Sequence, residues 1–116
     1  MATVTEQELI AQAVLDYYEG WFDGDAVRME RALHPNLVKR RAGEELGITT
    51  KERMLELTRR GEGKADAVDR HVDVKVVEIY DDIATAVAHT TPYHEYLHLV
   101  RTGEGWKIAN VLWRRS

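Results

Sequence analysis

The stretch that decides the fold is residues 93–113, YHEYLHLVRTGEGWKIANVLW. Apolar and polar residues alternate on both sides of Thr102-Gly-Glu-Gly105, and glycine in a loop permits the positive φ angles that tight turns need. The stretch therefore predicts two long antiparallel strands joined by a short turn.

Symmetric pairing across this turn predicts which face each side chain takes. One face would carry Tyr93, Glu95, Leu97, Leu99, Trp106, Ile108, Asn110 and Leu112. The other would carry His94, Tyr96, His98, Val100, Lys107, Ala109, Val111 and Trp113. Both faces are partly apolar, which a sheet with one solvated face does not require. We expect the first face to pack on the chain's own helices and the second to meet another surface.

Three helices are expected before these strands. Thr5-Glu-Gln-Glu8 has the form of a capping box, and an apolar stripe at helical spacing follows it to Phe22. Asp25 predicts the cap of a second helix, which Pro35 stops because proline disfavours α geometry in the residue before it. Thr49-Thr-Lys-Glu52 predicts the start of a third helix.

Strands are expected around the third helix. Residues 37–41 predict a short strand and 42–48 a loop. From His71 the apolar period becomes two, with a turn at 80–83 and a returning strand over 84–91. The predicted order is α-α-β-α-β-β-β-β, an α+β fold in which a curved antiparallel sheet wraps around three N-terminal helices.

Composition limits the functions that are possible. A length of 116 residues predicts one domain over 1–116. A hydrophobic content of 44% and a charged content of 31% are typical of soluble globular proteins, and a net charge of −4 argues against general nucleic-acid binding. The chain has no cysteine for thiolate metal sites. With no leader and no apolar run near ~18 residues, we expect a cytoplasmic protein with no membrane partner.

The element order and four motifs resemble the nuclear transport factor 2-like (NTF2-like) superfamily. The motifs are Tyr17-Tyr-Glu-Gly-Trp-Phe-Asp-Gly-Asp25, Leu33-His-Pro-Asn36, Tyr96-Leu-His-Leu99 and Gly105-Trp-Lys-Ile-Ala-Asn-Val-Leu-Trp113. The similarity spans about residues 6–115 and is nearest to the small, SnoaL/ketosteroid isomerase-like bacterial proteins called "putative lumazine-binding". It implies a cone with an internal cavity, in a superfamily that includes isomerases, dehydratases, polyketide cyclases and pure binding domains.

The resemblance implies two candidate catalytic residues. Tyr17 stands seven residues before Gly24, where ketosteroid isomerase-like members carry a tyrosine that donates a hydrogen bond to an enolate oxygen. Glu95 stands eight residues before Gly103, where the isomerases carry an acid. A protonated acid beside a tyrosine is the oxyanion hole of those enzymes.

Each of these two residues also has a structural interpretation. Tyr17 can be a core tyrosine whose hydroxyl reaches a backbone partner. A carboxylate on an apolar face is costly unless it is partnered, so Glu95 can instead lie near the open rim and pair with Arg40, Arg41 or Arg101.

The general base of the isomerases has no counterpart in this sequence. Those enzymes place an aspartate on the strand after the second helix, and the alignment puts Arg41 or Arg40 there. An arginine cannot abstract a proton, but it suits an anionic ligand. His89, expected to point inward, and His34, at the end of the second helix, could act as the base instead. A hydrogen-bonded core histidine is the alternative for either.

Two further histidines, His94 and His98, are expected on the outside of the sheet. His94 and His98 are four residues apart on one strand, a separation of about 13 Å, so we assign no metal. The resemblance implies that His94, Tyr96, His98 and Trp113 form the face through which relatives make two-fold dimers.

Three hypotheses follow for the function. The first is a homodimeric protein that binds a small aromatic or anionic molecule in a pocket formed by Tyr17, Trp21, His34, Arg41, Met54, His89, Tyr93, Glu95 and Asn110. The second is a lyase, isomerase or cyclase that needs no cofactor and acts on a small carbonyl or polyketide-like substrate. There Tyr17 and Glu95 would polarise the carbonyl, and His89 or His34 would move the proton. The third is an interaction module with a filled core.

Overall fold

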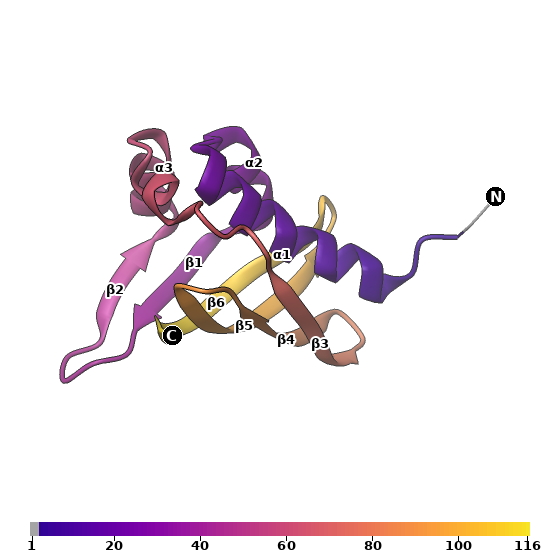
Figure 1. The fold of residues 1–116 in the computed structure, drawn as a ribbon. Coiled ribbons are helices and arrows are strands. Elements are labelled where there is room, and N and C mark those ends of the chain that lie inside the picture. Colours follow the sequence, from indigo (N-terminus) through magenta and orange to yellow (C-terminus); the bar gives the residue numbers. More distant parts are fainter. Residues whose placement is uncertain (1–2) are drawn as a thin grey trace.

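The computed structural model describes residues 3–116 and shows three α-helices on one face of a curved six-stranded sheet (Figure 1). The helices are α1 (Glu6–Asp23), α2 (Ala26–Ala32) and α3 (Lys51–Arg59), followed by a 3₁₀ turn η1 (Glu62–Asp66). The strands are β1 (Leu33–Arg41), β2 (Gly47–Thr50), β3 (Asp73–Tyr80), β4 (Ile83–His89), β5 (Tyr93–Thr102) and β6 (Gly105–Arg115). The predicted α+β class, a sheet wrapped around three helices, is confirmed.

The sheet is mixed, whereas the sequence analysis expected it to be antiparallel throughout. The strand order is β2-β1-β6-β5-β4-β3, and β1 runs parallel to β6 while every other neighbouring pair is antiparallel. β1 starts directly after the end of α2 and then runs along β6 in the same direction. β2 is a second departure, since it begins at Gly47 inside the stretch 42–48 that was expected to be a loop.

The helix starts follow the capping signals in the sequence. Thr5 Oγ1 accepts a hydrogen bond from the backbone N–H of Glu8 at 3.1 Å, and the Asp25 carboxylate caps α2. In α3 the capping hydroxyl belongs to Thr50 rather than Thr49. α2 ends at Ala32, three residues before the proline that was expected to stop it.

A β-bulge interrupts the hairpin formed by β5 and β6. Leu99 lies opposite Ile108, as symmetric pairing predicts. His98 then lies opposite Asn110, so Ala109 is an extra residue with no partner of its own. Because side chains alternate with a period of two, one extra residue exchanges the faces of everything beyond it.

This bulge exchanges the two faces of β6 after Ala109. Val111 is buried, while Leu112 is 44% exposed. Trp113 packs against the core, and Asn110 is exposed on the outside. The prediction that Asn110 and Leu112 point inward and Trp113 outward was therefore wrong.

A second bulge lies in the hairpin formed by β3 and β4. Val76 pairs with Ala86 and Glu78 pairs with Thr85, which leaves Val77 without a partner. The inner face of β4 consequently carries three buried alanines, Ala84, Ala86 and Ala88. The residues between them, and His89 after them, take the outer face.

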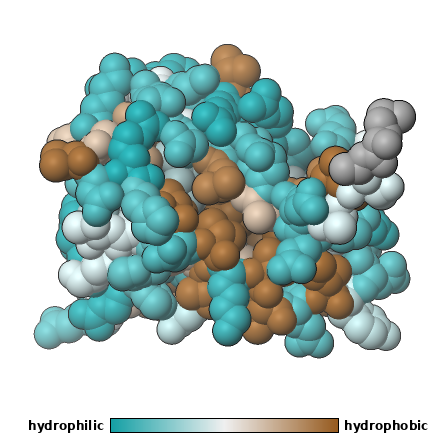
Figure 2. Space-filling view, turned by 45° about the vertical axis from the view of Figure 1, so that its right-hand side comes forward, coloured by the Kyte–Doolittle hydropathy of each residue, from teal (hydrophilic) through white to brown (hydrophobic). Residues whose placement is uncertain are grey.

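The core lies between the inner face of the sheet and α1. Its largest fully buried side chains include Tyr17, Tyr18, Phe22, Met29 and Leu97. Apolar side chains are also exposed on the side of the molecule that carries α1 and β3 (Figure 2). Within residues 3–116, no helix has the length and apolar character that crossing a membrane requires.

Candidate functional site

A cavity of about 420 Å³ lies between the helices and the inner face of the sheet. Aromatic and charged side chains make up most of its wall. They are Tyr17, Tyr18, Trp21, Lys39, Arg41, Glu62, Asp66, Tyr93, Glu95, Trp113 and Arg115. Met54 and Leu57 of α3 and residues 47–49 of β2 complete the lining.

Tyr17 and Glu95 meet inside this cavity. α1 carries Tyr17 on its buried face, and β5 carries Glu95 on the inner face of the sheet. The Tyr17 hydroxyl donates a hydrogen bond to Glu95 Oε1 at 3.0 Å, and Glu95 is only 1% exposed. Burial, together with the nearby Glu95 carboxyl, raises the pKa of Tyr17 well above its ordinary value. Tyr17 therefore stays protonated and acts as a donor at neutral pH.

Lys39 is the third member of this group, and the sequence analysis missed it. Its Nζ donates a hydrogen bond to the Tyr17 hydroxyl and lies 4.0 Å from Glu95 Oε1. Its side chain is 12% exposed. Burial lowers the pKa of Lys39, and the attraction of Glu95 opposes that effect. Arg101, one of the three arginines expected as possible partners of Glu95, pairs with Glu6.

A signal for Lys39 was present in the sequence. Leu37 is buried, and alternation along β1 places Lys39 and Arg41 on the same inner side as Leu37. Arg41 lines the cavity but is more exposed, and its guanidinium carbon lies 5.4 Å from the centre of the Trp113 ring. Lys39, two residues earlier in β1, reaches the buried carboxyl.

Aromatic rings surround the Lys39 amine. Its Nζ lies 5.0 Å from the centroids of both the Tyr17 ring and the Trp113 ring. Trp113 occupies this position because of the bulge at Ala109, whereas the sequence analysis assigned it to the outer, dimer-forming face. The site thus combines a cation, a carboxyl group and flat apolar walls.

A second group of hydrogen-bonded side chains forms another part of the cavity wall. Trp21 Nε1 donates to the Tyr93 hydroxyl at 3.2 Å, and that hydroxyl donates to Asp66 of η1. Arg115 Nη1 lies 4.0 Å from Asp66 Oδ1. Burial and the bond to Asp66 raise the pKa of Tyr93. Trp21 and Tyr93 line the cavity where the sequence analysis placed them, as does Met54.

Tyr18 contributes a buried hydroxyl that makes no hydrogen bond of good geometry within residues 3–116, although burial and the nearby Glu95 carboxyl raise its pKa. The residue is 1% exposed and lines the same cavity. Leaving a buried polar group unpaired costs about 1–3 kcal/mol, and such groups in native proteins call for an explanation. Nothing in the sequence distinguishes Tyr18, because a second tyrosine in an apolar stripe is typical of a buried core residue.

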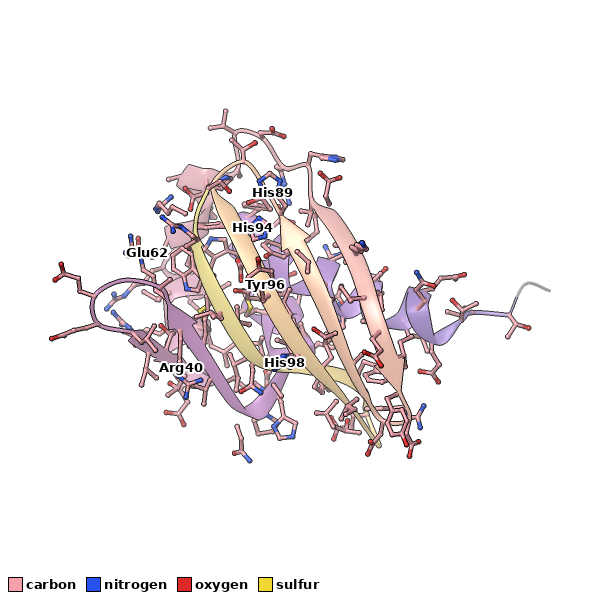
Figure 3. The ribbon with its side chains drawn as sticks, turned by 90° about the horizontal axis from the view of Figure 1, so that it is seen from below. Arg40, Glu62, His89, His94, Tyr96 and His98 are labelled. Atoms are coloured by element: carbon pink, nitrogen blue, oxygen red, sulfur yellow. The ribbon has the colours of Figure 1, made fainter. Side chains whose placement is uncertain are left out.

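The proposed bases and one proposed ligand residue lie away from the cavity. His89 is exposed on the outer face, where its ring centroid lies 5.4 Å from that of His94 (Figure 3). The bulge at Val77 reversed the expected direction of His89. The Nδ1 atom of His34 accepts from the backbone N–H of Asn36 at 3.0 Å, and His34 does not line the cavity. Asn110 lies on the outer face, beside His98.

The outer face of β5 carries His94, Tyr96 and His98, as the sequence analysis expected (Figure 3). Tyr96 is 54% exposed. In the described part of the chain, no three or more histidine and acidic side chains are grouped in a way that could hold a metal ion.

A family model described as "Putative lumazine-binding" matches residues 5–114. The chain belongs to this family. The sequence has no significant match among curated proteins.

Solved structures of NTF2-like proteins share the fold of this family member. An NTF2-like protein from Cytophaga hutchinsonii has a TM-score of 0.73 at 15% identity, with 97% of this chain and 100% of that chain covered. An NTF2-like protein of unknown function from Silicibacter pomeroyi has a TM-score of 0.71 at 19% identity, with the same coverage. A ketosteroid isomerase-like protein from Erwinia carotovora atroseptica has a TM-score of 0.67 at 15% identity, covering 97% and 98%.

Proposed function

We propose that the protein binds a small, flat aromatic molecule that bears a carbonyl or anionic oxygen. The observation that carries this proposal is a pair of unused donors on the wall of one cavity. These donors are the N–H groups of Lys39 beyond the one given to Tyr17, and the unpartnered hydroxyl of Tyr18. A ligand with more than one oxygen atom would offer an acceptor to each donor.

The size and lining of the cavity support the same proposal. Small-molecule sites usually enclose about 300–1,000 Å³ and combine apolar walls with a few polar groups. This cavity holds about 420 Å³. The rings of Tyr17 and Trp113 beside Lys39 offer flat surfaces for stacking, while Arg41 adds positive charge for an anionic ligand.

The family description suggests a first ligand to test. Lumazine is a flat bicyclic heterocycle with two carbonyl oxygens, so it matches both the aromatic walls and the donors. We therefore propose lumazine, or a ring system of the same kind, as the class of ligand.

Binding accounts for the site better than the isomerase-type reaction does. The only proton on the Tyr17 hydroxyl goes to Glu95, so Tyr17 is not free to donate to a substrate oxygen as it stands. Lys39, rather than an aspartate, projects from the strand that carries the base in isomerases. His89, the base that the second hypothesis preferred, lies outside the cavity.

Calorimetric titration with lumazine tests the proposal. We expect saturable binding that weakens about tenfold or more in Lys39→Met and measurably in Tyr18→Phe, because each loses a donor to the ligand. His98→Ala, on the outer face, is the matched control and should bind like the wild type. Equal affinity in all four proteins would contradict the assignment of this cavity, and so would heats indistinguishable from dilution.

We also propose that two copies associate through the outer sheet face. The support is a set of exposed apolar side chains on or beside that face, with Ile83 53%, Tyr96 54% and Leu112 44% exposed. Sedimentation equilibrium should give a dimer that Tyr96→Glu weakens. A wild-type monomer at micromolar concentration would contradict this. A cytoplasmic location stays a prediction.

A further inference from the structure

We infer that Lys39 is a nucleophilic amine that forms a reversible imine with a small aromatic aldehyde or ketone in the cavity. The inference rests on the proposed function, because the carbonyl compound must occupy the same cavity. It adds covalent chemistry that simple binding does not require.

The geometry supplies what an imine-forming lysine needs. Lys39 projects from the inner face of β1 into a cavity large enough for a ring system. Its stem is mostly buried, and the hydrogen bond to Tyr17 fixes the position of Nζ. The ring of Trp113 on one side would hold an aromatic carbonyl compound against the amine.

The surroundings of Lys39 also make the neutral amine, which is the nucleophilic form, easier to reach than in an exposed lysine. Burial is the largest influence and lowers its pKa, and Glu95 only partly offsets it. The further charged groups of the wall, Arg41, Arg115, Glu62 and Asp66, balance one another in sign. Tyr17 is protonated, so it adds no negative charge to stabilise an ammonium group.

The reaction balances without an oxidant or a further reactant. The lone pair of Nζ attacks the carbonyl carbon, and the π electrons of C=O move to oxygen, which takes up a proton. The carbinolamine then loses its hydroxyl group and one more proton as water, while the nitrogen lone pair forms C=N. Both protons come from the amine. Glu95, whose Oε1 lies 4.0 Å from Nζ, can carry them from nitrogen to oxygen.

Lys39 is the one lysine that lines this cavity among those in residues 3–116. Lys107 donates to the backbone carbonyl of Arg31 in an exposed position. Lys75 lies exposed on the outer side of β3. These amines therefore serve as internal references for the reactivity of Lys39.

Reductive trapping tests the inference. The protein is incubated at pH 7 with salicylaldehyde and sodium cyanoborohydride, and modified amines are located by mass spectrometry of proteolytic peptides. We expect a single early adduct on Lys39, formed at least tenfold faster than on any other amine of the same chain. Lys39→Arg should lose it, and the matched control Lys75→Arg should keep it.

Adducts spread evenly over the surface lysines would overturn the inference, as would an unchanged early adduct in Lys39→Arg. The comparison within the wild-type chain needs no variant, so poor folding of Lys39→Arg cannot obscure the result. Lumazine titration separates the two proposals. Saturable lumazine binding without trapping at Lys39 overturns the imine and leaves the proposed function standing. Failure of both experiments overturns both.

Discussion

Lys39 Nζ lies 4.0 Å from Glu95 Oε1, and the Tyr17 hydroxyl is hydrogen-bonded to both side chains. β1 supplies the cation, β5 the carboxyl and α1 the hydroxyl between them. A carboxyl that is 1% exposed needs such partners, because an isolated buried charge is very costly. The same three groups that make this burial possible face the cavity, so stability and ligand chemistry depend on the same atoms.

Replacing the buried carboxyl by its neutral isostere tests how much this group stabilises the fold. Glu95→Gln keeps the shape but leaves Lys39 without an opposite charge, and we expect the free energy of unfolding at pH 7 to fall by about 1–3 kcal/mol. Urea unfolding followed by tryptophan fluorescence measures it. Glu104→Gln, in the exposed β5–β6 turn, is the control and should change stability by less than about 0.5 kcal/mol. A gain in stability for Glu95→Gln would instead identify Glu95 as a strained functional acid.

The lowered pKa of Lys39 gives a pH dependence of stability with a definite sign. The unfolded chain holds this proton up to an ordinary pKa of 10.5, whereas the folded protein releases it at lower pH. The unfolded state therefore binds more protons in that interval, and stability rises with pH by up to about 1.4 kcal/mol per pH unit. We expect the stability of the wild type relative to Lys39→Met to increase as the pH rises toward 10.5. A flat or falling difference in urea unfolding would contradict the lowered pKa.

Two neighbouring tyrosines should respond in opposite ways to loss of the hydroxyl. Tyr18→Phe removes an unpartnered buried hydroxyl, and we expect it to stabilise the ligand-free protein by about 1 kcal/mol. Tyr17→Phe removes hydrogen bonds to Glu95 and Lys39, and we expect it to destabilise by about 1–3 kcal/mol. Thermal and urea unfolding of the two variants provide the comparison. Destabilisation by Tyr18→Phe would mean that its hydroxyl has a partner.

A glycine pair tests the packing of η1 on α1. A Cβ atom at Gly63 would lie 2.3 Å from the carbonyl oxygen of Trp21 and 2.6 Å from its ring, so Gly63→Ala must move η1 or the ring. We expect a loss of about 1–3 kcal/mol and, because Trp21 and Asp66 line the cavity, weaker lumazine binding. Gly103→Ala, where a Cβ would meet nothing within 4 Å, is the control. Equal stability of the two variants in urea would contradict the close contact.

Short-range signals in the sequence were enough to predict the class of the fold and the inward placement of Tyr17 and Glu95, whereas the family resemblance implied that the two residues act together. The alternation near the turn places Glu95 inside, because no bulge interrupts β5 itself. Helical spacing puts Tyr17 on the buried side of α1. Both depend on one element at a time, which is where local patterns are most informative.

The parts of the site that were not predicted depend on the two bulges. In β6 both faces are apolar, so Leu112 and Trp113 each fit an inward position and alternation alone cannot choose between them. Alternation around Val77 is ambiguous in the same way, so it does not predict that His89 points outward. Lys39 was missed for a different reason: the family resemblance points to Arg40 or Arg41, while the alternation that starts at Leu37 places Lys39 on the inner face.

The parallel pairing of β1 with β6 makes the last strand of the domain the centre of its sheet. During synthesis, α1, β1 and β2 emerge long before the strand that joins them to β5. Until residues 105–115 leave the ribosome, β1 has only the four residues of β2 beside it, and Lys39 has no cavity to enter. Folding of this domain therefore cannot proceed stepwise from its N-terminus, and the nascent chain must keep its apolar helix face from aggregating until the final strand is available.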